Sequence, residues 1–138
     1  MTDIGFVEAF SKFSAKLDNP MWAVSAIAKD GALVVSCWAH YFKKGDKGSL
    51  LYVDSLSRWN GNDLGNNLLR THISRAFSNS LPVRVVVATA KDTNAIDHGN
   101  DASKVKKTFH VREDLVGKVI AFDGDDFIIE FKKCTPIH

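Results

Sequence analysis

The stretch VRVVVATA, residues Val83 to Ala90, is a near-continuous run of β-branched and small apolar residues. Only Arg84 and Thr89 interrupt it with polar side chains. A strand with one face in water alternates apolar and polar residues, whereas a strand covered on both faces does not need to. The stretch therefore predicts a central strand with a layer of structure on each face, and the flanking segments have to supply those layers.

Two amphipathic helices are predicted before this strand. Between Ile4 and Leu17, apolar residues recur at steps of three and four until Asp18-Asn19-Pro20 ends the pattern. A second helix is expected from about Leu64 to Phe77, where Asn62 or Asp63 can cap the free amides of the first turn. Each helix has one apolar side that can cover one face of the central strand.

A hairpin is predicted between the two helices. Its strands run from Trp22 to Ala28 and from Ala32 to Phe42, and Lys29-Asp30-Gly31 joins them with an Asp-Gly pair that favours a tight turn. A cluster of Gly, Lys and Asp between Lys43 and Gly48 ends the second strand, and Ser49 to Asp54 is predicted as a third strand.

The segment after the central strand adds further β-structure. The polar stretch from Asp92 to Ser103 is predicted as a long loop, and Lys106 to Arg112 as a strand. A second hairpin is expected from Val119 to Asp123 and Phe127 to Lys132, turning at Gly124-Asp125. The whole pattern predicts one α+β domain over residues 1–138, with a mostly antiparallel curled sheet of about six or seven strands and two main helices.

The composition is that of an ordinary folded protein, with 45% hydrophobic and 25% charged residues. Cys37 sits in an apolar run and lies far from Cys134, which favours a buried thiol over a disulfide framework. No apolar stretch approaches the roughly 18 residues that a membrane helix needs, and the N-terminal segment MTDIGFVEAF lacks the features of a secretory signal. We therefore expect a cytoplasmic protein.

The distribution of positive charge points to a class of partner. The net charge of +2 is too small to indicate a polyanionic partner by itself, so the arrangement of the cations has to decide whether there is one. Arg70 and Arg75 fall on the polar side of the second predicted helix, and alternate residues of the later strand form an outward row that includes Lys106 and His110. These two segments, with the lysines between Lys43 and Lys47, could neutralise phosphates.

Aromatic side chains would add base recognition to such a surface, because nucleobases stack on rings. Trp59 is the best candidate, since it follows Arg58 in a polar loop, whereas Trp22 and Trp38 are predicted to pack in strands. We predict a non-enzymatic protein that binds nucleic acid, either DNA or RNA, without a metal or cofactor. The predicted binding residues are Arg58, Trp59, Arg70, Arg75, Lys104, Lys106, His110 and Arg112.

Two alternative interpretations do not involve nucleic acid. Lysines on an exposed strand prevent edge-to-edge aggregation, and arginines late in a helix are favoured by its dipole, so the cations can also form an ordinary solvated exterior. A small domain without catalytic motifs can also act as a protein-interaction module or as an inhibitor of a larger complex.

A metal-dependent nuclease is a further alternative. Glu130-Phe131-Lys132 matches the E-x-K part of a nuclease pattern. Asp123, however, is expected at the hairpin tip while Glu130 lies three residues down the other strand, so the carboxylates do not converge and a plain Glu/Lys pair is favoured. Asp97, His98 and Asp101 supply ligand atoms without a second cluster. His72 and His40 are predicted as packing residues, and Cys37 and His40 point to opposite faces of their strand.

Overall fold

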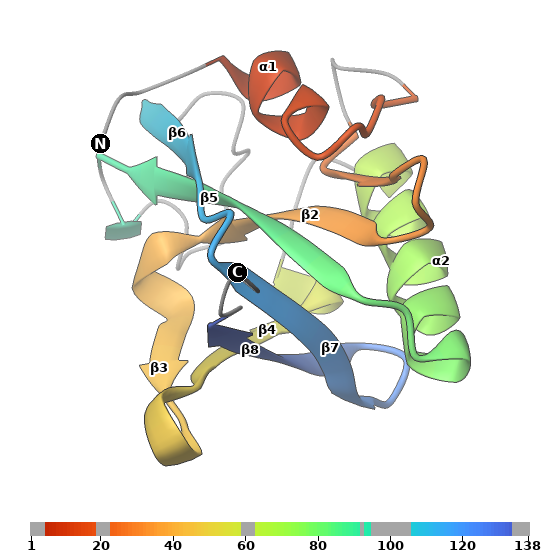
Figure 1. The fold of residues 1–138 in the computed structure, drawn as a ribbon, viewed down its shortest axis with the longest axis vertical. Helices are drawn as coiled ribbons and strands as arrows, with labels where there is room; N and C mark the ends of the chain where they lie inside the picture. Colours follow the sequence, from red (N-terminus) through yellow and green to blue (C-terminus); the bar gives the residue numbers. More distant parts are fainter. Residues whose placement is uncertain (1–4, 19–22, 59–62, 92, 95–105, 134–138) are drawn as a thin grey trace, which may run out of the picture.

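The structure is a computed structural model that describes residues 5–18, 23–58, 63–91, 93–94 and 106–133. No helix in these ranges is long and apolar enough to cross a membrane. Figure 1 shows the elements. In chain order they are α1 (Phe6–Ser11), β1 (Ser25–Ile27), β2 (Leu33–Trp38), η1 (Ala39–Tyr41), β3 (Phe42–Lys44), η2 (Asp46–Gly48), β4 (Leu50–Ser55), η3 (Leu56–Arg58), α2 (Asp63–Asn79), β5 (Val83–Ala90), β6 (Lys107–Val111), β7 (Leu115–Phe122) and β8 (Asp126–Lys133), where η marks a 3₁₀ turn.

The strands form one eight-stranded sheet in the order β1-β2-β5-β7-β8-β4-β3, with β6 paired beside β5. β2 and β5 run parallel, and every other pair is antiparallel. The predicted α+β fold with a mostly antiparallel sheet and two helices is therefore confirmed. The strand beyond the predicted seven is β3, because η1 divides the segment predicted as one strand from Ala32 to Phe42.

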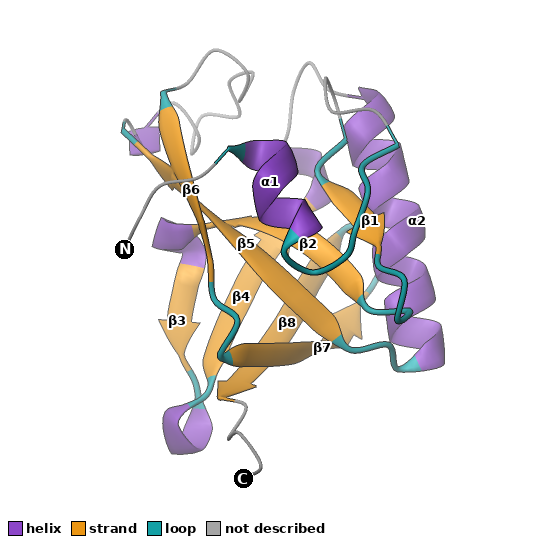
Figure 2. Ribbon diagram, turned by 45° about the horizontal axis from the view of Figure 1, so that its top comes forward, coloured by secondary structure: helices purple, strands orange, loops and turns teal. Residues whose placement is uncertain are grey.

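The sheet curls because the short turn η1 connects two strands that lie near opposite ends of the strand order. β2 lies second from one edge of the strand order and β3 forms the other edge, yet only the three residues of η1 separate them in the chain. The curled sheet therefore brings β2 and β3 together at η1, which lies between them on the left of Figure 2. We call this junction the seam.

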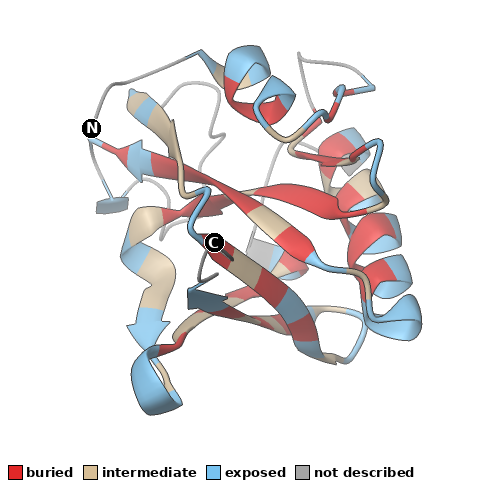
Figure 3. Cartoon of the chain, in the orientation of Figure 1, coloured by how far each residue is buried: buried red, intermediate tan, exposed pale blue. Residues whose placement is uncertain are grey.

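β5 is the central strand that its sequence predicts. β2 pairs with one edge of β5, and β6 and β7 share the other. Val85 packs in a core cluster with Ile73 of α2, whereas Val86 packs in a second cluster with Phe10 of α1, and both valines are 0% exposed. The two helices thus cover opposite faces of β5, and Figure 3 shows the resulting buried zone along β2 and β5.

The first helix is shorter than its apolar periodicity predicts. The prediction extends from Ile4 to Leu17, but α1 ends at Ser11. Ser14 adopts a positive φ of 59°, and its carbonyl accepts a hydrogen bond from Lys29 N–H at 3.1 Å. Ala15 then forms an isolated antiparallel bridge with Ala28. Pairing with the hairpin turn therefore replaces the last turns of the predicted helix, while Ala15 and Leu17 stay buried.

α2 confirms the second predicted helix and places His72 as a packing residue. His72 is 8% exposed, and its Nδ1 lies 2.8 Å from the hydroxyl oxygen of Ser25 on β1. Burial lowers the pKa of His72 below its ordinary 6.5; Asp18 opposes this shift and Arg75 adds to it. His72 therefore joins α2 to the sheet in its neutral form.

This environment of His72 predicts a pH-dependent contribution to stability. Below pH 6.5 the unfolded chain binds a proton at this position more readily than the folded chain, so the contribution is complete above pH 6.5 and is lost as the pH falls below it. Urea unfolding at about pH 7.5 and about pH 5.5 should show a larger loss for the wild type than for His72→Gln. Equal losses in the two proteins would contradict this role.

Candidate nucleic-acid interface

The two basic segments predicted to form one surface lie apart. α2 packs against β1, β2 and β7, whereas β6 packs against β5 and α1. Figures 1 and 2 both show α2 and β6 at opposite ends of β5. The structure therefore does not bring Arg70 and Arg75 together with the cations of β6. Trp59, Lys104 and the side chain of Arg58 lie outside the described part of the chain.

The two arginines of α2 have different surroundings. Arg70 donates from Nη1 to Asn67 Oδ1 at 2.9 Å and from Nε to the carbonyl of Gly124 at 3.4 Å. It thereby connects α2 to the turn between β7 and β8. Arg75 is exposed one helical turn further along. Part of the hydrogen-bonding capacity of Arg70 thus serves the fold.

The β6 segment is only partly the outward row that its alternation predicts. Lys106 and Thr108 are exposed, but His110 is half-buried opposite the core residue Val87. Arg112 makes two hydrogen bonds of 2.9 Å to the carboxylate of Asp114. The hydrogen bond from this guanidinium holds the pKa of Asp114 below its ordinary value. The exposed part of the row is therefore its beginning, at Lys106 and Thr108.

An aromatic pair lies at the seam, close to this exposed end. The rings of His40 and Tyr41 in η1 have centroids 4.2 Å apart, with His40 exposed and Tyr41 half-buried. Tyr41 in turn lies 6.5 Å from Tyr52, centroid to centroid. Trp38 is only 6% exposed, which confirms its predicted packing role. A row of rings therefore extends from the surface at His40 into the core.

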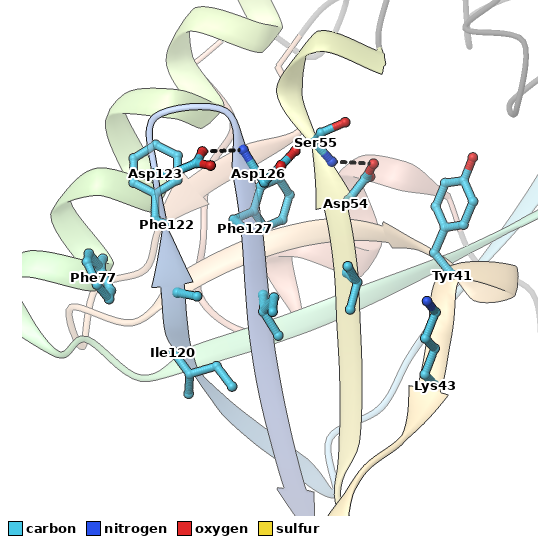
Figure 4. A pocket seen from close by; sticks show the side chains of 13 residues that line it. Tyr41, Lys43, Asp54, Ser55, Phe77, Ile120, Phe122, Asp123, Asp126 and Phe127 are labelled. Carbon is cyan, nitrogen blue, oxygen red and sulfur yellow. Dashed lines mark hydrogen bonds between the residues drawn. The ribbon is translucent and has the colours of Figure 1, made fainter.

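A buried hydrogen-bond chain fixes the position of η1. The hydroxyl of Tyr52 accepts from Trp38 N–H at 3.1 Å and donates to Asp54 Oδ2 at 2.9 Å. The other oxygen of Asp54 accepts from Ser55 N–H at 2.8 Å, as the dashed line in Figure 4 marks. The chain ties the end of β2 to β4 across the seam. Trp38, the residue that precedes η1, is thus held by the core and not by the loop alone.

Three exposed lysines lie on separate segments at this end of the sheet. Lys91 N–H donates to the carbonyl of Lys106 at 2.8 Å, which extends the β5–β6 ladder by one step. Tyr41 packs against the cluster that contains Ala90, the last residue of β5, and Lys43 follows Tyr41 on β3. All three lysines are exposed, and none pairs with a carboxylate among the described residues. We call His40, Tyr41, Lys43, Lys91 and Lys106 the seam surface.

Sequence reasoning found only part of this surface. Lys106 and Lys43 were among the predicted cations, but Lys91 was not, and His40 was predicted to pack within a strand. The exposure of His40 results from η1, which interrupts the predicted strand after Trp38. The adjacent polar residue and tyrosine in an otherwise apolar run, His40-Tyr41, are the local signal for that interruption.

The carboxylates of the second hairpin make separate local contacts. Asp123 Oδ1 accepts the backbone N–H groups of Asp125 and Asp126 at 2.9 and 2.7 Å, which caps the turn. Glu130 lies 3.9 Å from Lys132 as an ion pair. Within the described ranges there is no group of three or more residues able to hold a metal ion. Asp97, His98 and Asp101 lie outside those ranges.

Cys37 has the surroundings of an inert thiol. It is 0% exposed, whereas His40 is exposed on η1. Burial raises the pKa of Cys37 well above its ordinary value, and the charge of Asp54 raises it further. The thiolate form that nucleophilic chemistry needs is therefore disfavoured.

The chain was also compared with known proteins. No protein-family model, curated protein or solved structure matches it.

Proposed function

We propose that this protein binds single-stranded DNA or RNA at the seam surface. The observation that supports the proposal is the pair of His40 and Tyr41 rings, 4.2 Å apart with His40 exposed and Tyr41 half-buried, together with exposed lysines on three segments at this end of the sheet. Unpaired bases stack on such rings, while lysines bind the phosphates that connect those bases. A surface of this kind provides binding without a catalytic group.

The geometry favours an unpaired strand over a duplex. An aromatic ring accepts the flat face of a base, and that face is available only when the base is out of its stack. Tyr41 is supported from behind by Tyr52 and the core, so the ring pair is held in place before a base arrives. Lys43, Lys91 and Lys106 are point charges that do not distinguish one base from another. We therefore expect binding with little sequence preference.

Charge reversal at two lysines tests this surface. The variant Lys91→Glu/Lys106→Glu should bind a fluorescein-labelled single-stranded oligonucleotide of mixed sequence at least roughly tenfold more weakly than the wild type at about 50 mM salt. With three phosphate contacts, the wild-type affinity should fall with a slope of about 2 in a plot of log affinity against log salt, and the variant should have a slope below about 1. Fluorescence anisotropy measures both quantities.

A control variant with the same change in net charge separates local contacts from overall charge. Lys29 and Arg75 are exposed on the β1–β2 turn and on α2, away from the seam. Lys29→Glu/Arg75→Glu should therefore retain near wild-type affinity. If this control loses affinity as much as the seam variant, or if the wild type binds neither DNA nor RNA at low salt, the proposal is wrong.

A further inference from the structure

The strands β7, β8, β4 and β3 line a broad open hollow of about 920 Å³ on the outside of the curled sheet. Figure 4 shows Phe77 and Ile120 on one side of this hollow and Tyr41 and Lys43 on the other, with Asp123 and Asp126 at its hairpin end. Phe77 and Ile120 are 43% and 42% exposed and lie in the same hollow, next to the half-buried Ile128. Apolar surface of this kind, rimmed by charge, is typical of an interface.

The strand register arranges the outward residues of this face in rows. The middle row is apolar and consists of Ala121, Ile128 and Val53. Two residues nearer the hairpin tip, Asp126 lies opposite Ser55, and Asp123 caps the turn. A third row lies two residues beyond Ile128 along β8, on the side away from the hairpin tip. It contains Lys118, Glu130, Leu51 and Lys43.

This face is therefore acidic at one end, apolar in the middle and basic at the other end. Glu130 is the exception in the basic row, but Lys132 lies 3.9 Å from it and compensates its charge. Lys118 and Lys43 remain exposed on either side. Because residues in a strand rise about 3.3 Å each, the acidic and basic rows lie at similar distances, about 6 to 7 Å, from the row of Ile128.

We propose that a second copy of this chain covers the face in a two-fold symmetric dimer. A rotation of 180° about an axis that lies in the interface and runs parallel to the row of Ala121, Ile128 and Val53 places each apolar row over the other. The same rotation places Asp126 and Asp123 of one copy over the basic row of the second copy. A two-fold interface requires a surface that is complementary to itself, and this charge pattern meets that requirement. The sheets would then pack face to face, as in a β-sandwich.

The size of the face sets the expected strength of the dimer. Four strands about 4.8 Å apart and about 20 Å long cover on the order of 400 Å² in projection. Stable interfaces bury about 800 Å² on each partner, so this dimer is expected to be weak and to depend on concentration. Its charge pairs lie near solvent, so added salt should weaken it.

Sedimentation equilibrium of the full chain at low salt, without nucleic acid, tests the dimer by charge swapping. The wild type should self-associate, and Lys118→Asp or Asp126→Lys alone should raise the dissociation constant about fivefold or more. The double variant Lys118→Asp/Asp126→Lys should recover dimerisation, because each copy again presents opposite charges to the other. Lys29→Asp, away from this face, should have no effect. Circular dichroism checks that all variants fold.

Several results would overturn the dimer. If the wild type stays monomeric up to a protein concentration of about 1 mM, the proposed interface does not exist. Folded single variants that dimerise like the wild type would show that these charges are not at the contact. A double variant no better than the single ones would exclude the two-fold arrangement. Neither swapped residue belongs to the seam surface, although Tyr41 and Lys43 lie in both surfaces, so the measurement without nucleic acid tests the dimer separately from binding.

Discussion

Replacing Gly117 with valine is expected to lower the free energy of unfolding by about 3 kcal/mol, as overpacking of a well-packed core does. A Cβ atom at Gly117 would lie 2.6 Å from Cδ1 of Phe131 and 2.9 Å from the carbonyl oxygen of Glu130. The Phe131 ring is fully buried and the Glu130 carbonyl belongs to the β8 backbone, so neither atom can move without disturbing its surroundings. Valine adds two methyl groups to this clash.

The position of Gly117 in the sheet increases the effect. It pairs with Phe131 of β8 and also with Val83 of β5, and Val83–Gly117 is the only residue pair that the β5–β7 ladder contains. A shift of β7 would therefore loosen the junction between the two halves of the curled sheet. Urea unfolding followed by circular dichroism measures the change.

Gly5 provides the control for this prediction. An added Cβ at Gly5 meets no atom within 4 Å, so Gly5→Ala should change stability by less than about 0.5 kcal/mol. If Gly117→Val is as stable as Gly5→Ala, Gly117 of β7 does not lie as close to Phe131 as described.

Replacing Tyr52 with phenylalanine is expected to cost roughly 2 to 4 kcal/mol, because two buried groups each lose a hydrogen bond worth about 1 to 3 kcal/mol. The hydroxyl accepts from Trp38 N–H and donates to the carboxylate of Asp54, which is 8% exposed. Phenylalanine keeps the ring packing, so the loss reports on the hydroxyl. The same substitution should weaken oligonucleotide binding, since it releases the residue that precedes η1.

A double-mutant cycle isolates this hydrogen bond. Tyr52→Phe and Asp54→Asn, measured singly and together by urea unfolding, should show a coupling energy of about 1 kcal/mol or more. Effects that add within about 0.5 kcal/mol would mean that the two side chains do not act together.

The parts of the fold that local chemistry determines were predictable from the sequence. The apolar run of β5 indicated a strand covered on both faces, and the apolar side of α2 indicated a helix that packs on it. The Asp-Gly pair at Gly31 and the turn at Gly124 located both hairpins, and Phe122 pairs with Phe127 as expected. Each of these features depends on residues that are neighbours in the chain.

The remainder depends on contacts between distant segments. The division of the Ala32 to Phe42 run follows from the pairing of β3 with β4, and the early end of α1 follows from the bridge between Ala15 and Ala28. Neither pairing leaves a periodic signal in the segment itself. Propensity and periodicity therefore predicted a longer strand and a longer helix than tertiary pairing allows.

The candidate site shows the same division. Phe109 and Val111, which alternate with the predicted outward row, pack against the α1 cluster, but alternation along β6 could not show that Arg112 pairs with Asp114. The separation of α2 from β6 is a consequence of the strand order around β5, which the sequence does not encode locally. Of the predicted binding residues whose side chains the structure describes, Lys106 is the one that lies in the seam surface.

The most direct test of the proposed binding surface is an NMR titration of the ¹⁵N-labelled protein with a single-stranded oligonucleotide. We predict that the largest backbone amide shifts cluster at His40, Lys91 and Lys106, and that the amides around Arg75 on α2 do not move. Shifts centred on α2, or no shifts at low salt, would contradict the seam surface as the binding site.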